Sequence, residues 1–244
     1  MSWHKNLIAS FDLETTGVDV EADRIVTASR WIIDPAKGSK VHCGWLVNPG
    51  IEIPAEASAI HGVTTEQARE RGQDASKAVR EIAGDLVHWH REGAVVVAFN
   101  AAYDLTLLHR ECLRHGHIEE ALGLAKLRPV VDPHVIDKGL DRYRKGSRKL
   151  LDVAAHYGIE LSEDDAHGSA ADALAAARVA YVIAQRYPHI GRTPADELHD
   201  LQREWKALQA ESLQKYLRKK DKGATVSPHW PLIPAPAVPQ EQTR

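Results

Sequence analysis

The order of strand-like and helix-like segments restricts the fold of this chain more than any other feature. Three strand-like runs come first, and the turn between the second and the third contains Pro35 and Gly38. Segments with helical spacing then alternate with short apolar segments. The predicted strands are 7–11, 24–33, 41–47, 94–98 and 129–131, and the predicted helices are 75–91, 102–115, 149–157 and 170–186. This order predicts an α/β or α+β fold in which helices flank a mixed five-stranded sheet.

The sequence changes character near residue 193, so that an appended segment, 191–244, is expected to follow a domain of residues 1–190. A helix is predicted to begin near Pro194 and to extend as far as Lys222, because apolar residues recur there at steps of three and four. The apolar stripe consists of Leu198, Leu201, Trp205 and Leu208. Residues 228–239 contain too many prolines for a helix and are predicted to form an extended tail.

Charge and cysteine content narrow the range of functions. The chain has 31 basic and 34 acidic residues, so it cannot bind polyanions by bulk positive charge, and any contact with nucleic acid has to be local. Cys43 and Cys112 are far apart and belong to no C-x-x-C pair, which disfavours a disulfide framework or a cysteine-based zinc site. No apolar run of about 18 residues or more occurs. We therefore expect a soluble cytoplasmic protein that does not enter a membrane.

Two carboxylates lie at the end of the first predicted strand. The strand period places Phe11 and Leu13 on one face and Asp12 and Glu14 on the other. Like charges about 4 Å apart cost on the order of 4 kcal/mol at an effective dielectric constant of about 20, so a dense carboxylate cluster needs a divalent cation or a bound proton. The alternative is a strand end that enters the polar turn 15–17 with both acids solvated.

Two further acids and a histidine lie at the edges of later elements. Asp104 falls in the first turn of the helix after the fourth strand, where a favourable interaction with the helix dipole is the simpler explanation. Asp172 follows Ser169 with the spacing of a capping box, and His167 precedes both in a loop. The alanine-rich helix predicted there has little side-chain bulk. It could therefore lie close to the sheet and bring Asp172 near the first strand.

In combination, these segments resemble the DEDDh 3′-to-5′ exonucleases, a DnaQ-like family typified by the proofreading epsilon subunit of bacterial DNA polymerase III. The resemblance spans about residues 5–186. The sequence departs from the family pattern at two positions, where Tyr103 replaces a frequent phenylalanine and Phe99 replaces a frequent histidine. The motifs that carry it are Phe-Asp-Leu-Glu-Thr-Thr-Gly at 11–17, Ile-His-Gly-Val-Thr at 60–64, Asn-Ala-Ala-Tyr-Asp at 100–104, and His167 to Asp172.

The resemblance implies a ribonuclease H-like fold and a metal-dependent hydrolase. Asp12, Glu14, Asp104 and Asp172 would hold two divalent ions, Mg²⁺ or Mn²⁺, which favour oxygen ligands. His167 would act as the general base that activates water for attack on the terminal phosphodiester, since the pKa of a histidine is about 6.5. The implied activity is 3′-to-5′ release of nucleoside 5′-monophosphates from DNA, in proofreading or repair.

Contacts with the terminal nucleotide are expected, by analogy with the family, from five residues. These are Thr15, Thr16, His61, Asn100 and Tyr103. The Tyr103 ring would stack on a base, although core packing is an alternative role for it. The alternative for His61 is a polar cap for the helix that begins at 64–66.

A basic loop is the best local candidate for contact with the phosphate backbone. Residues 142–149 contain five cations and no acid, and Arg144 and Arg148 are the candidate phosphate ligands. Such charge runs are more often solvated surface, which is the alternative here.

Substrate and partner remain open at this point. The expected partner is nucleic acid with a free 3′ end, foremost single-stranded DNA. The same fold could trim RNA, because recognition of the 2′-hydroxyl depends on pocket shape. A non-catalytic binding or scaffolding module is a third possibility, which is disfavoured because all five motif positions are filled. The tail around Trp230, Leu232 and Ile233 could dock on the chain's own domain, or it could anchor a polymerase or another protein.

Overall fold

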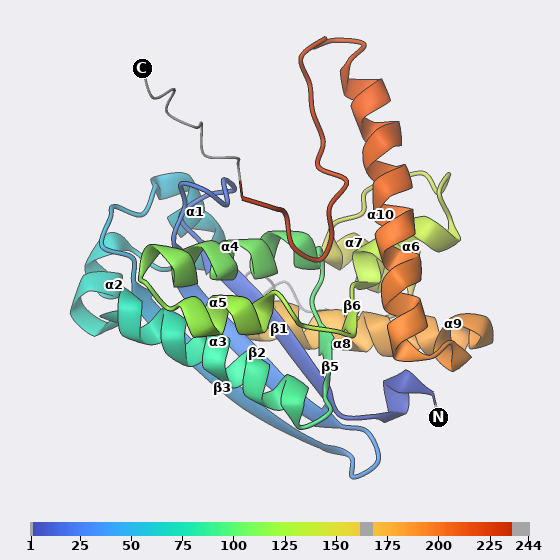
Figure 1. Ribbon diagram of the computed structural model, residues 1–244, viewed down its shortest axis with the longest axis horizontal. Coiled ribbons are helices and arrows are strands. Elements are labelled where there is room, and N and C mark those ends of the chain that lie inside the picture. Colours follow the sequence, from blue (N-terminus) through green and yellow to red (C-terminus); the bar gives the residue numbers. More distant parts are fainter. Residues whose placement is uncertain (1, 162–167, 236–244) are drawn as a thin grey trace, which may run out of the picture.

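The computed structural model describes residues 2–161 and 168–235, and its centre is one mixed sheet (Figure 1). The strands are β1 (Ile8–Thr15), β2 (Ile25–Asp34), β3 (Ser39–Asn48), β4 (Gln73–Asp74), β5 (Val95–Val97) and β6 (Val130–Val131). Their order is β4-β3-β2-β1-β5-β6. Strands β1, β2 and β3 pair antiparallel, whereas β5 runs parallel to β1 and β6 parallel to β5. The predicted α/β fold with a mixed sheet is confirmed.

The sheet has six strands, so the predicted number of five is wrong. The additional strand, β4, consists of two exposed polar residues that pair in parallel with Val47 and Asn48 of β3. A strand this short and polar has no hydrophobic alternation, and the sequence therefore carries no signal for it.

Helices cover both faces of the sheet. Helix α3 (Ala75–Arg91) has the predicted bounds, and the three other helices predicted within residues 102–186 deviate by at most one residue at either end. They are α4 (Ala101–Arg114), α7 (Leu150–His156) and α8 (Ser169–Arg186). Within the described residues, no helix is both long enough and apolar enough to cross a membrane.

Several short helices were not predicted. Helix α2 (Thr65–Arg71) begins at the expected position. Four other helices of five to eight residues have too few turns to show a clear helical period in the sequence. They are α1 (Ala55–His61), α5 (Ile118–Leu124), α6 (Pro133–Leu140) and α9 (Pro188–Arg192).

Two hydrophobic cores lie on opposite faces of the sheet. Phe11 and Leu13 of β1 belong to the core with α3, α4 and α5, whereas Ile8 belongs to the core with α7, α8 and α9. This division follows from the alternation of side chains along a strand. In Figure 1, α3, α4 and α5 lie in front of the sheet and α8 lies behind it. The even-numbered side chains of β1 therefore face α8.

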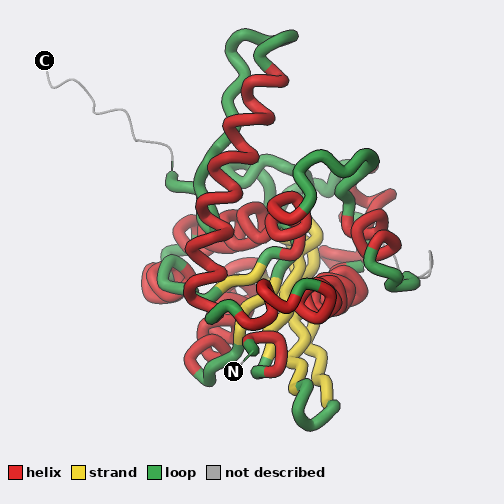
Figure 2. The backbone as a smooth tube through the Cα atoms, turned by 90° about the vertical axis from the view of Figure 1, so that its right-hand side faces the viewer, coloured by secondary structure: helices red, strands yellow, loops and turns green. Residues whose placement is uncertain are grey.

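Helix α10 (Ala195–Leu217) packs against α6 and β6, and it ends before the predicted Lys222. The first part of its apolar stripe is buried, because Leu198 is fully enclosed and Leu201 packs against the α8-side core. Leu208, by contrast, is 55% exposed. Figure 2 shows that the C-terminal part of α10 and the loop after it project from the body of the protein.

Side chains of α10 complete the outer edge of β6. The buried Gln202 side chain accepts a hydrogen bond from Asp132 N (2.6 Å) and donates to Val130 O (3.0 Å), as a peptide group of a neighbouring strand would. His199 Nδ1 accepts from Val130 N (3.1 Å). Burial lowers the pKa of His199 to about 4, so the ring is neutral and can accept this bond at neutral pH. The edge strand is thereby covered without a further strand.

We expect Gln202→Leu to lower the free energy of unfolding by about 2 to 4 kcal/mol, because it leaves two buried backbone groups without a hydrogen-bond partner. Each unsatisfied buried group costs about 1 to 3 kcal/mol. Urea unfolding at neutral pH measures the change. Glu204→Leu, at an exposed position of the same helix, is the matched control and should change stability by less than about 0.5 kcal/mol. Equal stability of the two variants would contradict the edge-capping role of Gln202.

The start of the tail docks on the chain's own domain, which is the first of the two expected alternatives. The buried Trp230 indole donates to Asp132 Oδ2 (3.2 Å). The Ile233 backbone donates to Thr106 Oγ1 (2.9 Å) and accepts from Arg110 Nη2 (2.8 Å) on α4. Residues 230–233 are therefore held by the domain, and Trp230 fills a place in its core.

Candidate active site

Carboxylates of β1 and α8 meet on the face of the sheet opposite Phe11 and Leu13. The carboxylate oxygens of Asp12, Glu14 and Asp172 lie within 4.8 Å of one another. Two of these residues are neighbours on one strand, whereas Asp172 is distant in sequence. The two β1 acids are therefore half-buried and lie beside a third acid, and they are not isolated groups at a strand end.

Close packing of α8 on the sheet brings Asp172 to this position. Ser10 Oγ of β1 donates to Ala173 O (2.5 Å), and Trp31 Nε1 of β2 donates to Ala170 O (2.7 Å). The alanines of α8 allow this approach because they add almost no bulk. The Ser169 hydroxyl bonds to Ser29 Oγ (2.9 Å), and the N-cap of α8 is Gly168. Ser169 is thus not the N-cap that the capping-box alternative requires.

Asp104 approaches the same place from α4. Its side chain is buried, and its Oδ1 accepts a hydrogen bond from Leu13 N of β1 (3.2 Å). The hydrogen bond from the residue next to Asp12 places the Asp104 carboxylate beside the β1 acids, and Asp12 and Asp104 line the same cleft. Interaction with the helix dipole alone would not direct Asp104 onto β1 in this way.

The electrostatics of the four carboxylates are unfavourable without a cation. Burial, followed by the charges of Asp104, Asp172 and Glu14, raises the pKa of Asp12 well above its usual range. Burial and Asp172 raise the pKa of Glu14 to about 7. Burial raises that of Asp104 to about 8, although the hydrogen bond from Leu13 lowers it. Oxygen donors that repel one another at this density suit a hard divalent cation such as Mg²⁺ or Mn²⁺.

A cleft of about 540 Å³ opens beside Asp12 and Asp104. Asn100 and Tyr103 line it, as the sequence analysis expects of residues near a substrate. Asn100 adopts a left-handed backbone conformation (φ 62°), and its N–H donates to the buried Asp132 (2.9 Å). His167, the predicted general base, lies outside the described residues.

The two threonines after Glu14 take part in local hydrogen bonds. Thr15 Oγ1 lies 2.7 Å from the Tyr103 hydroxyl, and both groups donate to Gly17 O (2.6 and 2.5 Å). Thr16 is buried, and its hydroxyl donates to Asp23 Oδ1 (2.7 Å). These bonds fix the turn between β1 and β2. Tyr103 is held by its hydroxyl on this turn while it lines the cleft.

His61 is the last residue of α1 and is half-buried. Its Nδ1 accepts a hydrogen bond from Val63 N (3.2 Å), and burial lowers its pKa. The cap of α2 is a capping box of Thr64 and Gln67. The alternative that His61 caps this helix is therefore wrong.

The two candidate phosphate ligands of the basic loop are paired within the protein. Arg144 Nη2 lies 2.7 Å from the buried Asp137 carboxylate, and Arg148 forms an ion pair with the same oxygen. Burial would raise the pKa of Asp137, but the hydrogen bonds from Arg148 and Arg144 hold it below its usual range. The loop is thus anchored on α6 and is more than a solvated charge run. Arg148 also lines the cleft beside Asp12.

Two residues of the cleft region were missed by the sequence analysis. His134 lines the cleft next to Phe99, with ring centroids 5.1 Å apart, and burial lowers its pKa to about 3. Asp132 is fully buried and binds the first N–H groups of both α4 and α6. Its signal was present, because an Asp directly before a Pro after a strand marks a helix start.

The sequence and structure are similar to those of known exonucleases. The family model described as Exonuclease (RNase_T) matches residues 10–180. A DNA polymerase III subunit epsilon-like protein of Rhodobacter capsulatus is 32% identical over 170 residues, which cover 68% of this chain and 22% of that protein. The DNA polymerase III subunit epsilon of Treponema pallidum is 29% identical, over 64% of this chain and 70% of its own.

Solved structures with the same fold are also nucleases. Exonuclease I of E. coli in complex with a dT13 oligonucleotide superimposes with a TM-score of 0.62 at 17% identity, over 76% of this chain and 42% of that one. Another structure of exonuclease I gives a TM-score of 0.65 with the same coverage. This chain thus spans less than half of those nucleases and about a fifth of the R. capsulatus relative.

Proposed function

Because the chain belongs to the exonuclease family, whose model covers residues 10–180, we propose that it removes nucleotides from the 3′ end of DNA as nucleoside 5′-monophosphates. The observation that carries this proposal is the convergence of Asp12, Glu14 and Asp172 within 4.8 Å, with Asp104 hydrogen-bonded onto the same strand. Proofreading or repair is the proposed context, since two relatives carry the name of a polymerase III epsilon subunit.

The proposed roles follow the positions of the side chains for the four carboxylates and the family resemblance for His167. Asp12, Glu14, Asp104 and Asp172 would hold two divalent cations, Mg²⁺ or Mn²⁺. When bound, these cations supply Lewis-acid stabilisation of the attacking and leaving oxygens. His167 is proposed to accept the proton of the attacking water, as a base with a pKa near neutrality can. Cleavage of the P–O3′ bond then leaves the phosphate on the released nucleotide and a new 3′-hydroxyl on the strand.

The cleft residues are proposed to position the terminal nucleotide. The Tyr103 ring lines the cleft with its hydroxyl anchored on Gly17 O, so it offers an oriented face for a base. Asn100 lines the same wall, whereas the Thr16 hydroxyl is used within the turn. We therefore propose that Thr15 and Thr16 act through the position of their turn, with His61 beside it.

A nuclease assay with defined ends tests the proposal. Single- and double-stranded DNA and RNA of about 12 nucleotides, labelled at the 5′ end or the 3′ end, are incubated with Mg²⁺, Mn²⁺ or a chelator. We expect 3′-labelled DNA to release mononucleotides at once, 5′-labelled DNA to shorten stepwise, and chelator to stop both, because the carboxylates need cations.

Each arm of the assay separates one alternative. Faster cleavage of RNA than of DNA would make the protein a ribonuclease, and release from the 5′ end would contradict the proposed polarity. Absence of cleavage with every substrate and metal, in protein that binds the strands, would favour a non-catalytic binding module.

A further inference from the structure

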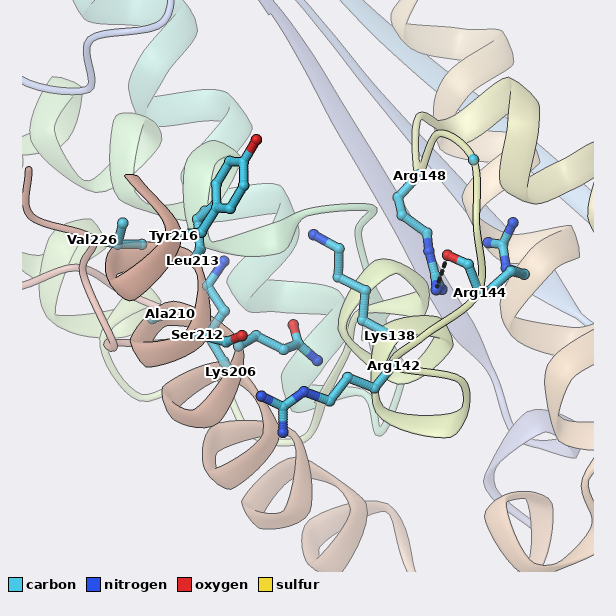
Figure 3. A pocket seen from close by; sticks show the side chains of 12 residues that line it. Lys138, Arg142, Arg144, Arg148, Lys206, Ala210, Ser212, Leu213, Tyr216 and Val226 are labelled. Carbon is cyan, nitrogen blue, oxygen red and sulfur yellow. Dashed lines mark hydrogen bonds between the residues drawn. The ribbon is translucent and has the colours of Figure 1, made fainter. Parts of the chain in front are cut away.

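A second cavity, of about 440 Å³, lies between α6, the loop 141–149 and α10. Its lining includes five cations and no acid: Lys138, Arg142, Arg144, Arg148 and Lys206. Figure 3 shows that these side chains come from two sides, with Lys138 and Arg142 on α6 and the loop and Lys206 on α10. We call this site the basic cavity. The family match ends at residue 180, so α10 contributes a wall that the family pattern does not include.

Part of the positive charge of the basic cavity has no ion-pair partner within 4 Å among the residues that the structure describes. Arg144 and Arg148 share the carboxylate of Asp137. Lys138, Arg142 and Lys206, by contrast, form no ion pair with any residue that the structure describes. Gathering cations in a recess without anions is unfavourable, and a ligand with several negative charges would remove this cost.

The cations of the basic cavity also act on one another and on a neighbouring histidine. Burial lowers the pKa of Lys138, and the charges of Lys206 and Arg148 lower it further. Burial and then Lys138 and Lys206 also lower the pKa of His134, which lines the acidic cleft.

The basic cavity and the cleft share one lining residue. Arg148 lines both sites, and the next residue, Lys149, lines the cleft with Asp12 and Asp104. A phosphodiester strand whose end lies at the carboxylates would meet Arg148 first and then the unpaired cations. Tyr216, which is 60% exposed, stands at the α10 wall and offers a face on which a base can stack.

We propose that the basic cavity binds backbone phosphates of a single strand on the 5′ side of the scissile bond, so that α10 and α6 form the walls of a strand channel. This inference rests on the proposed function and adds a path for the substrate. The cations account for binding of a polyanion by a protein whose net charge is −3, because they are concentrated at one place.

Charge neutralisation within the basic cavity tests the proposal. The variant Arg142→Gln/Lys206→Gln removes two unpaired cations and leaves the pairs to Asp137 intact. The matched control is Arg69→Gln/Arg71→Gln, which removes two exposed cations of α2. This helix packs on β3, toward the opposite edge of the sheet from β6. The affinity for a fluorescent single strand is measured in chelator at several salt concentrations. The strand has about 12 nucleotides, a length within the range of single-strand binding sites.

The double variant is expected to bind the strand about tenfold more weakly, and the slope of log affinity against log salt should fall by about 1.4, since each phosphate contact on a single strand contributes about 0.7. The control should bind as the wild type does. Hydrolysis of a labelled dinucleotide in Mg²⁺ should change by less than about twofold in both variants, because its one phosphodiester is the scissile bond and it has no further phosphate for the basic cavity.

Three outcomes would overturn the proposal. The first is unchanged affinity and salt slope in the double variant, and the second is an equal loss in the control. The third is a double variant that binds the strand with full affinity but no longer binds a nucleoside monophosphate. The cavity would then be a site for free nucleotides. Failure of the proposed function would look different, because wild-type protein would then hydrolyse neither substrate while the binding measurement still reports on the basic cavity.

Discussion

Asp12→Asn is expected to lower the exonuclease rate by about 10³-fold or more. The side chain keeps its shape but loses the charge that holds a cation, and a bound cation stabilises the transition state by several kcal/mol. Each 1.36 kcal/mol corresponds to a factor of about 10 in rate. The initial rate of mononucleotide release at saturating Mg²⁺ measures the effect.

The control for Asp12→Asn is Glu92→Gln, which makes the same carboxylate-to-amide change at an exposed position after α3. It should retain the wild-type rate. Circular dichroism has to show that Asp12→Asn is folded. A folded variant with more than about a tenth of the wild-type rate would refute the role of Asp12 as a cation ligand.

Asp104→Asn is expected to stabilise the metal-free protein at pH 8, and so to raise its melting temperature. The reason is the pKa of Asp104, which burial raises to about 8 from an ordinary value near 4. The folded state thus holds the proton more tightly than the unfolded state. The contribution of Asp104 to the stability of the metal-free protein should therefore fall as pH rises from about 4 to about 8, and the asparagine should remove this contribution.

The opposite sign is expected for Asp137→Asn, which provides the control. Hydrogen bonds from Arg148 and Arg144 outweigh burial and lower the pKa of Asp137, so its charge stabilises the fold above the ordinary pKa. Its removal leaves two arginines without their shared partner and should destabilise the protein. Thermal unfolding in chelator from pH 4 to pH 8 measures both variants, and a loss of stability in Asp104→Asn at pH 8 would contradict the electrostatic account.

Addition of Mg²⁺ should stabilise the wild type more than it stabilises Asp104→Asn. A ligand at about 100 times its dissociation constant stabilises the folded state by about 2.7 kcal/mol. The wild type gains this stabilisation because its carboxylates bind the cation, whereas the variant gains little. Equal shifts of the melting temperature by Mg²⁺ would place the cation elsewhere.

Local periodicity explains the success of the sequence analysis. The bounds of α3 and the alternation of Phe11, Asp12, Leu13 and Glu14 depend on residues close together in the chain, so they can be read without coordinates. The resemblance to the exonucleases then named Asp104 and Asp172 as partners of the β1 acids. Their convergence itself required the packing of α8, which only the fold provides.

The sequence by itself determined which residues carry the acidic cluster and that helices flank a mixed sheet. The tertiary structure alone decided that Arg144 and Arg148 neutralise Asp137, that Gln202 completes the edge of β6, and that Lys206 of α10 faces the basic loop. The physical reason is the range of the interactions. Secondary structure follows from neighbours within a few residues, whereas ion pairs, edge caps and cavities form between segments that only the folded chain brings together.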